Sequence, residues 1–269
     1  MTLLFTSLFS AEAMPAPPQP PEPDFVWTAN LRYRFSASEG VHKDDEATPA
    51  ADGEGVARWI NLGSAEDALQ PVAARRPAYH TGGLAGRPYI ACDRTLEQHF
   101  EDLAFTQPSG LTSLDPFTVF AVTDAVAALD QFPALLGSPA TNGGKVGFYF
   151  REPAGAQIHW IKSQIRLGDI TNPQLVMAAA GRNAAGATSS PNTRFWLRQN
   201  RVGLWETTSQ SSNLSSTAIA TTQFLRSTGL STNGYFHGHL YEFLLYDGTL
   251  DDETTFAVED WLAERYGLT

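Results

Sequence analysis

The feature that most constrains the fold is a series of short segments rich in aromatic and β-branched residues, separated by turns. In segment 31–35, apolar residues alternate with Arg32 and Arg34, which is the period of a half-buried strand. Segment 117–124 is apolar at nearly every position, as in a central strand. Further candidate strands are 56–61, 87–92, 146–151, 175–180, 194–197 and 235–247. Such a series predicts an all-β antiparallel β-sandwich or jelly roll.

Local signals add three details to this prediction. Gln199 and Asn200 separate two strand-like runs and predict a hairpin. Gly238, inside the long segment 235–247, predicts a bulge or a close packing contact. One short C-terminal helix is expected over 251–266, with acidic residues in its first turn and Gly267 as its stop. Its apolar stripe is formed by Val258, Trp261, Leu262 and Tyr266.

Composition limits the classes of partner. The formal net charge is -11, so phosphate backbones and anionic membranes are repelled, and we expect neither nucleic acid nor membrane as a partner. Cys92 is the single cysteine, so no internal disulfide can form. We expect Cys92 to be a small buried residue in a strand rather than a reactive thiol.

The first 24 residues differ from the rest and are interpreted as an anchoring arm, with residues 25–269 forming the sandwich. The arm's apolar residues are Leu3, Leu4, Phe5, Leu8 and Phe9, and six prolines follow between positions 15 and 23. The first basic residue is Arg32, so the basic start of a secretory signal is missing. A proline-rich stretch acts as a stiff spacer. We therefore expect the apolar residues to dock onto another chain, the alternative being that they fold back onto their own sandwich.

Several motifs along residues 31–268 resemble one family. These are 56–59 (VARW), 76–79 (RPAY), 82–88 (GGLAGRP), 115–120 (DPFTVF), 236–247 (FHGHLYEFLLYD) and 260–268 (DWLAERYGL). Together they resemble laminin-G-like domains of the concanavalin A-like lectin/glucanase superfamily. The resemblance implies the sandwich fold but not one function, because this fold carries lectins, glycosidases and structural modules.

The same resemblance suggests where such a chain works. Related domains are common in phage virion proteins, as head decorations, spikes or tail components, and in bacterial surface proteins. It therefore implies a virion structural protein, held by its arm on a capsid or tail protein and forming a homo-oligomer. The alternative is a secreted or cell-surface carbohydrate-binding module.

Catalytic motifs are not recognisable, so we expect no enzyme activity and assign no catalytic residue. The carboxylate run that glucanases of this superfamily carry on one strand is missing. Glu242 and Asp247 are five residues apart and should lie on opposite faces of a strand. Glu242 matches a family position of structural kind. A glycan-cleaving enzyme remains the second alternative.

Metal sites are not predicted either, and no cofactor is expected. His237 and His239 would share one face of a strand and could chelate a metal, but no third ligand is evident, which favours a pair of surface histidines. The resemblance allows calcium at a rim, for which Asp93, Asp124 and Asp169 are candidates without a motif to select one.

Aromatic residues could bind sugars, because the apolar face of a sugar ring stacks on exposed tryptophan or tyrosine. Trp160, Trp196 and Trp205 lie near turns and form our candidate glycan platform. Trp59 and Trp261 are expected in the core. The sequence thus leaves three hypotheses open: an assembly protein, a carbohydrate-binding module and a glycan-cleaving enzyme.

Overall fold

The structure is a computed structural model that describes most of the chain after the arm. The described residues are 30–44, 47–104, 117–125, 134–137, 148–151, 157–159, 174–182, 193–199, 202–207, 222–228, 234–248 and 250–268. The apolar arm residues Leu3, Leu4, Phe5, Leu8 and Phe9 therefore lie outside the described residues, and their docking stays a prediction.

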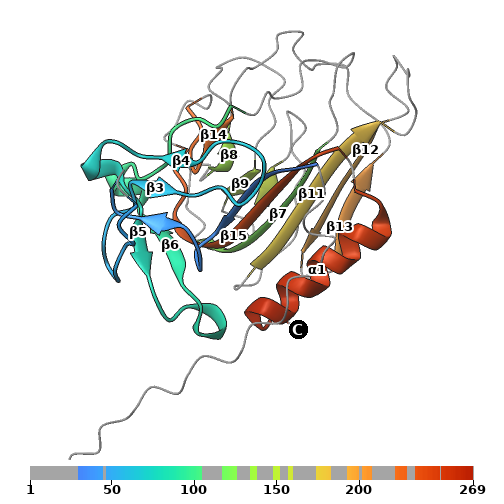
Figure 1. Ribbon diagram of the computed structural model, residues 1–269. Coiled ribbons are helices and arrows are strands. Elements are labelled where there is room, and N and C mark those ends of the chain that lie inside the picture. The colour runs from blue at the N-terminus through green and yellow to red at the C-terminus, as the bar shows by residue number, and fades with distance from the viewer. Residues whose placement is uncertain are drawn as a thin grey trace, which may run out of the picture.

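The strands and helices of the described residues are antiparallel β-strands, one C-terminal α-helix and short 3-10 turns, so the all-β class is as predicted (Figure 1). The strands are β1 (Leu31–Ser36), β2 (Val41–His42), β3 (Arg58–Trp59), β4 (Ala68–Leu69), β5 (Ala78–His80), β6 (Tyr89–Cys92), β7 (Phe117–Ala125), β8 (Ala134–Gly137), β9 (Phe148–Arg151), β10 (Gln157–His159), β11 (Gln174–Arg182), β12 (Thr193–Gln199), β13 (Val202–Thr207), β14 (Gln223–Phe224) and β15 (Gly238–Asp247). The helix α1 spans Asp252–Tyr266, and short 3-10 turns cover Ala73–Arg75, Leu84–Gly86 and Arg94–Leu96. Among the described helices, none is long and apolar enough to span a bilayer.

The described strands form three sheets, which make up the β-sandwich. The largest has the strand order β13-β12-β11-β7-β15-β6-β5, with β1 also pairing with β15. A second sheet has the order β10-β9-β8-β14, and a small third one the order β2-β3-β4. The predicted central strand is β7, which lies between β11 and β15. The predicted hairpin is confirmed, because β12 and β13 pair with Gln199 opposite Val202.

The large sheet is covered on both faces by described residues. On one face, a core of aromatic and aliphatic side chains includes Phe35, Trp59, Phe100, Phe224 and Phe243. On the other face, α1 lies alongside the sheet and buries its apolar stripe against β7 and β15 (Figure 1). Both predicted core tryptophans are buried, with Trp59 0% and Trp261 5% exposed.

The ends of α1 follow the local signals in the sequence. The side chain of Asp251 accepts a hydrogen bond from the backbone N–H of Thr254 at 2.7 Å, which caps the first turn. Gly267 ends the helix with φ of 64°, in the left-handed region that glycine adopts without steric strain. The expected helix and the observed one agree to within one residue at the N-terminus.

The strand containing Arg34 departs from the half-buried pattern. Arg34 is 0% exposed rather than pointing to solvent, because α1 covers the face on which it lies. Its Nε donates to Oε1 of Glu242 at 2.9 Å, so the buried charge has a buried counter-charge. The expected strand at 56–61 is also shorter, with only Arg58–Trp59 in β-structure.

A β-bulge interrupts β15, but not at Gly238. The register with β7 shifts between Leu240 and Glu242. As a result, Tyr241 and Glu242 both lie on the face covered by α1, whereas Leu240 and Phe243 belong to the opposite core. Gly238 has a φ of 138°, which accounts for a glycine there without a bulge at that residue.

Candidate functional site

A hollow of about 290 Å³ lies on the same face of the large sheet as α1, at the other end of the sheet. Its floor is formed by Ala78 of β5 and Ala91 of β6, which pair with each other. Gly238 of β15 pairs with Cys92, whose side chain belongs to the core on the opposite face, and this pair borders the hollow. The side chains of Ala78 and Ala91 are single methyl groups, so they leave room above the sheet that larger side chains would fill. The hollow is thus a product of strand pairing between segments distant in sequence.

Longer side chains form the rim of this hollow. They are His80, Asp93, Leu96, Gln98, His237 and His239. The histidines come from β5, from the residue before β15, and from β15 itself. His237 and His239 line the same hollow, as their spacing of two residues predicted. No described group of three His, Cys, Asp or Glu side chains could hold a metal ion.

A row of aromatic rings crosses this face, and we call His80, Tyr89 and His239 the histidine–tyrosine strip. The ring of Tyr89 stacks on that of His80 with centroids 5.3 Å apart, and lies 4.4 Å from that of His239. All three side chains are partly exposed. The buried ring of Tyr241 supports Tyr89 at 5.5 Å. The strip is therefore a continuous aromatic surface held in place from below.

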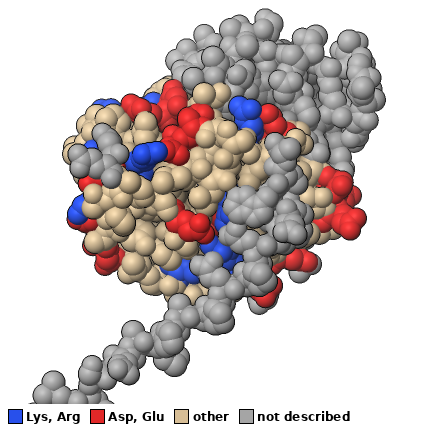
Figure 2. Space-filling view, in the orientation of Figure 1, with Lys and Arg blue, Asp and Glu red and all other residues tan. Residues whose placement is uncertain are grey.

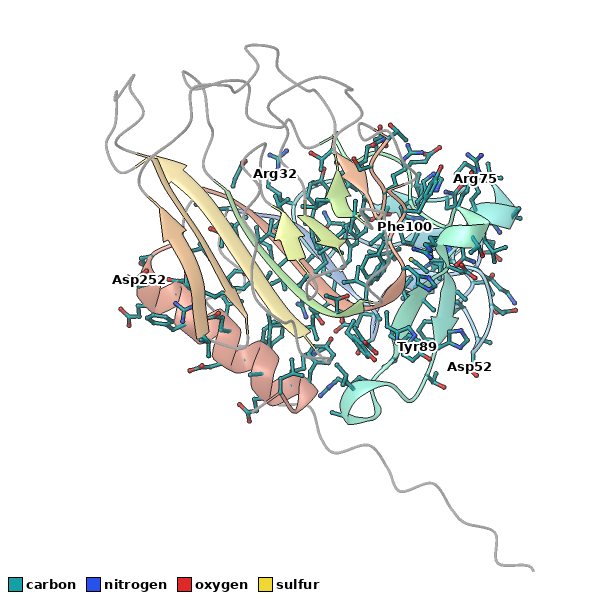
Figure 3. The ribbon with its side chains drawn as sticks, turned by 180° about the vertical axis from the view of Figure 1, so that it is seen from behind. Arg32, Asp52, Arg75, Tyr89, Phe100 and Asp252 are labelled. Carbon is teal, nitrogen blue, oxygen red and sulfur yellow. The ribbon has the colours of Figure 1, made fainter. Side chains whose placement is uncertain are left out.

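Each histidine of the site has its own aspartate neighbour. Nδ1 of His80 is 3.4 Å from Oδ1 of Asp52, and Nδ1 of His239 is 3.3 Å from Oδ2 of Asp124. Figure 3 shows Tyr89 and Asp52 on the same side of the molecule.

The third histidine–aspartate pair is farther apart, with Nδ1 of His237 3.9 Å from Oδ1 of Asp93. Asp124 belongs to β7, and Asp52 and Asp93 belong to two loops, so carboxylates from three segments lie beside the strip and the hollow.

Two of these carboxylates are stabilised in their ionised form by threonines. The backbone N–H of Thr81 donates to Asp52 at 2.8 Å and lowers the pKa of that carboxyl. The hydroxyl of Thr95 donates to Asp93 at 2.7 Å, and together with the Thr95 backbone N–H lowers the pKa of Asp93. Both groups therefore keep a negative charge well below neutral pH.

The arrangement has the two elements that sugar recognition requires. The strip offers a partly exposed aromatic surface, which the C–H groups of a pyranose or furanose can contact. The flanking aspartate oxygens accept hydrogen bonds from hydroxyl groups, and the imidazole nitrogens can donate or accept them. A small concave site with a few convergent polar groups is the usual form of a ligand pocket.

The predicted tryptophan platform is not tested by these observations. Trp160 lies outside the described residues, and so do the side chains of Trp196 in β12 and Trp205 in β13. The calcium candidate Asp169 also lies outside them, whereas Asp93 and Asp124 lie beside different histidines.

Three residues that the sequence analysis considered for catalysis, and did not assign to it, lie in the described part of the chain. Glu242 is 0% exposed, with one oxygen facing Arg34 and the other accepting from the Tyr266 hydroxyl at 2.6 Å. Asp247 lies on the opposite face and is half exposed, near Arg32. Cys92 is buried, and burial raises the pKa of its thiol far above the usual range.

A second hollow, of about 450 Å³, opens between β3, β4 and the segment near Glu101. Its carboxylates Glu66 and Asp67 form hydrogen bonds with other residues of the fold. Glu66 accepts from the hydroxyl of Tyr33 at 2.6 Å, and Asp67 accepts from Arg58 at 2.7 Å and from a backbone N–H. These bonds leave the second hollow a weaker candidate than the first.

Sequence reasoning missed His80 and Tyr89 as site residues. A signal was present, because alternation along 89–92 places Tyr89 and Ala91 opposite the buried Ile90 and Cys92. The alternation does not predict the lateral order of the strands, and this order brings His80 and His239 to either side of Tyr89.

Comparisons with known proteins give structural similarity only. No protein-family model matches the sequence, and no curated protein matches it. Among solved structures, domain 4 of AbnA, a GH43 extracellular arabinanase from Geobacillus stearothermophilus in complex with arabinotriose, is 13% identical. The match covers 86% of this chain and 98% of that one, with a TM-score of 0.44.

Two further solved structures are similar at the same level. The CBM40 of the Ruminococcus gnavus IT-sialidase is 12% identical with a TM-score of 0.40, and the match covers 59% of this chain and 96% of that one. The Trypanosoma rangeli sialidase in complex with sialic acid is 14% identical with a TM-score of 0.47, and the match covers 89% of this chain and 34% of that one. At these values the similarity concerns architecture alone.

Proposed function

We propose that this chain is a carbohydrate-binding β-sandwich that holds its ligand on the histidine–tyrosine strip and in the adjoining alanine-floored hollow. The observation that carries the proposal is the contact of the Tyr89 ring with the rings of His80 and His239, beside which Asp52 and Asp124 lie. A sugar ring in contact with the strip would present its hydroxyl groups to these carboxylates.

Rigidity of the strip supports this proposal. The Tyr89 ring rests on the buried Tyr241, and a carbon added to Gly83 would lie 2.7 Å from Cδ1 of Tyr89. The ring is therefore fixed from two sides before any ligand arrives. A preorganised aromatic surface loses little side-chain entropy on binding, which favours affinity.

We also propose that the chain binds without cleaving. Glu242 is buried under α1 with both oxygens occupied, so it has no access to a substrate. At the strip, Asp52 and Asp93 are held ionised by threonines, whereas a general acid needs a carboxyl group with a raised pKa. A reducing-sugar assay on any glycan that binds should give no release above that of the heat-treated protein.

The binding proposal is tested by removing the aromatic surface. Tyr89→Ala and His239→Ala should each weaken binding of an array-identified oligosaccharide by about tenfold or more, measured by calorimetric titration. Phe256→Ala is the matched control, because Phe256 is also a partly exposed aromatic residue but lies on α1. Equal binding by Tyr89→Ala and the native protein would refute the proposal.

The virion role is a separate proposal that rests on the arm and the family resemblance. A sandwich carried on a capsid or tail by residues 1–24 could also adhere to host glycans, so the two proposals are compatible. Deleting residues 1–24 should abolish incorporation into particles while leaving thermal unfolding of the sandwich unchanged. Particles that still incorporate the truncated protein would contradict it, and would favour a secreted or cell-surface module.

A further inference from the structure

The charges around the site are unevenly distributed. Three aspartates, Asp52, Asp93 and Asp124, flank the strip and the hollow, and each keeps a partly exposed side chain. The described residues that line the hollow include three histidines but neither lysine nor arginine. The three carboxylates thus flank a lining in which no described lysine or arginine offsets their charge.

Nearby guanidinium groups are directed elsewhere. Arg87 lies two residues before Tyr89, but its Nε donates to the backbone carbonyl of Arg265 at 2.6 Å, under the end of α1. Arg94 is adjacent to Asp93 and contributes to lowering its pKa, yet it does not line the hollow. On the face that Figure 2 shows, described Lys and Arg side chains are scattered among Asp and Glu.

We infer that the site selects neutral oligosaccharides and rejects acidic ones such as sialylated or uronic-acid glycans, an inference that rests on the proposed glycan-binding function. Proteins usually recognise a ligand carboxylate with the paired N–H groups of arginine or with lysine, and the described lining of the hollow has neither. A ligand carboxylate placed on the strip would instead lie near Asp52 and Asp124, and one placed in the hollow would lie near Asp93.

The expected discrimination follows from Coulomb repulsion at a partly exposed surface. Several like charges within a few ångströms of a ligand carboxylate should lower its affinity by about tenfold at low salt. Screening shortens the reach of this repulsion, because the Debye length falls from about 30 Å at 0.01 M salt to about 3 Å at 1 M salt. Charge-based selection should therefore weaken as salt is added, whereas a steric barrier would not respond.

The test uses the full chain and an array of neutral oligosaccharides, each beside its singly sialylated form, with lactose and 3′-sialyllactose among the pairs. Pairs that bind are then titrated at about 0.01 M and about 1 M salt, the two ends of the screening range. We expect the neutral member to bind about tenfold more tightly at low salt, and the ratio to approach one at high salt. The variant Asp52→Asn/Asp93→Asn/Asp124→Asn should lose most of the preference at low salt.

The outcomes separate the inference from the function beneath it. The inference would be overturned if sialylated forms bound as tightly as neutral ones at low salt. It would also be overturned if the preference for neutral forms did not change with salt concentration, and glycan binding itself would stand in both cases. If no glycan binds, or if Tyr89→Ala leaves binding unchanged, the proposed function is overturned and the inference with it. The salt series uses the native chain, so the test stands even if the triple variant does not fold.

Discussion

The hydroxyl of Tyr266, on α1, donates a hydrogen bond of 2.6 Å to Oε2 of Glu242, on β15. The other oxygen of Glu242 accepts from Nε of Arg34, on β1, at 2.9 Å, and Nε of Arg265 lies 3.5 Å from the carboxylate. One buried carboxylate thus joins two strands of the large sheet to the helix. Burial, together with the negative charge of Glu242, raises the pKa of Tyr266 well above its ordinary value, so the phenol stays the donor.

Replacing Glu242 with glutamine should destabilise the protein strongly. The change keeps the shape but removes the negative charge that faces the buried guanidinium groups of Arg34 and Arg265. Loss of one member of a buried ion pair costs about 3–5 kcal/mol, which urea denaturation can measure. Asp247→Asn is the control: Asp247 and Arg32 are 3.6 Å apart and exposed, so a change of less than about 1 kcal/mol is expected. Similar effects of the two variants would refute this account.

Trp59→Ala should open a cavity in the core between the sheets. The Trp59 ring lies 5.4 Å from that of Phe35 and 5.8 Å from that of Phe100, and its Nε1–H donates to the carbonyl of Ser36. Phe100 lies in the interior in Figure 3. We expect a loss of about 3–5 kcal/mol in the free energy of unfolding. Val72→Ala, at a residue that is 49% exposed, should change it by less than about 0.5 kcal/mol.

Gly83→Ala should weaken glycan binding without touching a ligand. The added carbon would lie 2.5 Å from Cε1 of Tyr241 and 2.7 Å from Cδ1 of Tyr89, so these rings must shift. Gly82→Ala is the neighbouring control. A carbon there meets nothing within 4 Å, although its φ of 79° makes the backbone strained. Gly82→Ala should therefore lower the melting temperature but preserve the affinity. If both variants bind alike, the strip does not depend on this contact.

His99 should make stability fall as the pH drops below neutral. Its Nδ1 lies 2.6 Å from the carbonyl of Glu97, and its Nε2 lies 2.9 Å from Nη1 of Arg226. A carbonyl only accepts and a guanidinium only donates, so the ring must be neutral with its proton on Nδ1. Burial is the largest cause that lowers the pKa of His99, and the charge of Arg226 lowers it further.

The direction of the pH effect follows from that lowered pKa. The folded state binds fewer protons at His99 than the unfolded state does, so this contribution is complete above about pH 6.5 and is lost as the pH falls through the folded-state pKa. Urea midpoints at about pH 7.5 and about pH 5 should differ less for His99→Gln than for the native chain. An unchanged difference would show that His99 does not contribute.

The elements that depend on neighbouring residues were readable from the sequence. Asp251 and Gly267 mark the two ends of α1, because a side-chain cap and a left-handed residue act within one helical turn. The hairpin at Gln199 and the central strand β7 were likewise predicted. The expected separation of Glu242 and Asp247 onto opposite faces also agrees with the structure.

Other features depend on contacts between distant segments. Arg34 looked like a solvent-facing residue, and only the packing of α1 over β1 explains its burial. The bulge before Glu242 shifts the alternation of β15, which no single glycine marks. The site residues follow the same rule: His80, Tyr89 and His239 come from three strands whose lateral order the sequence does not state.

The sequence by itself determined the strand pattern, the helix and its ends, the net negative charge and the buried place of Cys92. Only the tertiary structure decided that Ala78 would pair with Ala91, that Gly238 would lie opposite Cys92, and that an aromatic strip would border the resulting hollow. The physical reason is the distance along the chain over which each interaction acts. Capping, turns and alternation act over a few residues, whereas strand order and register are fixed by the burial of side chains that lie far apart along the chain.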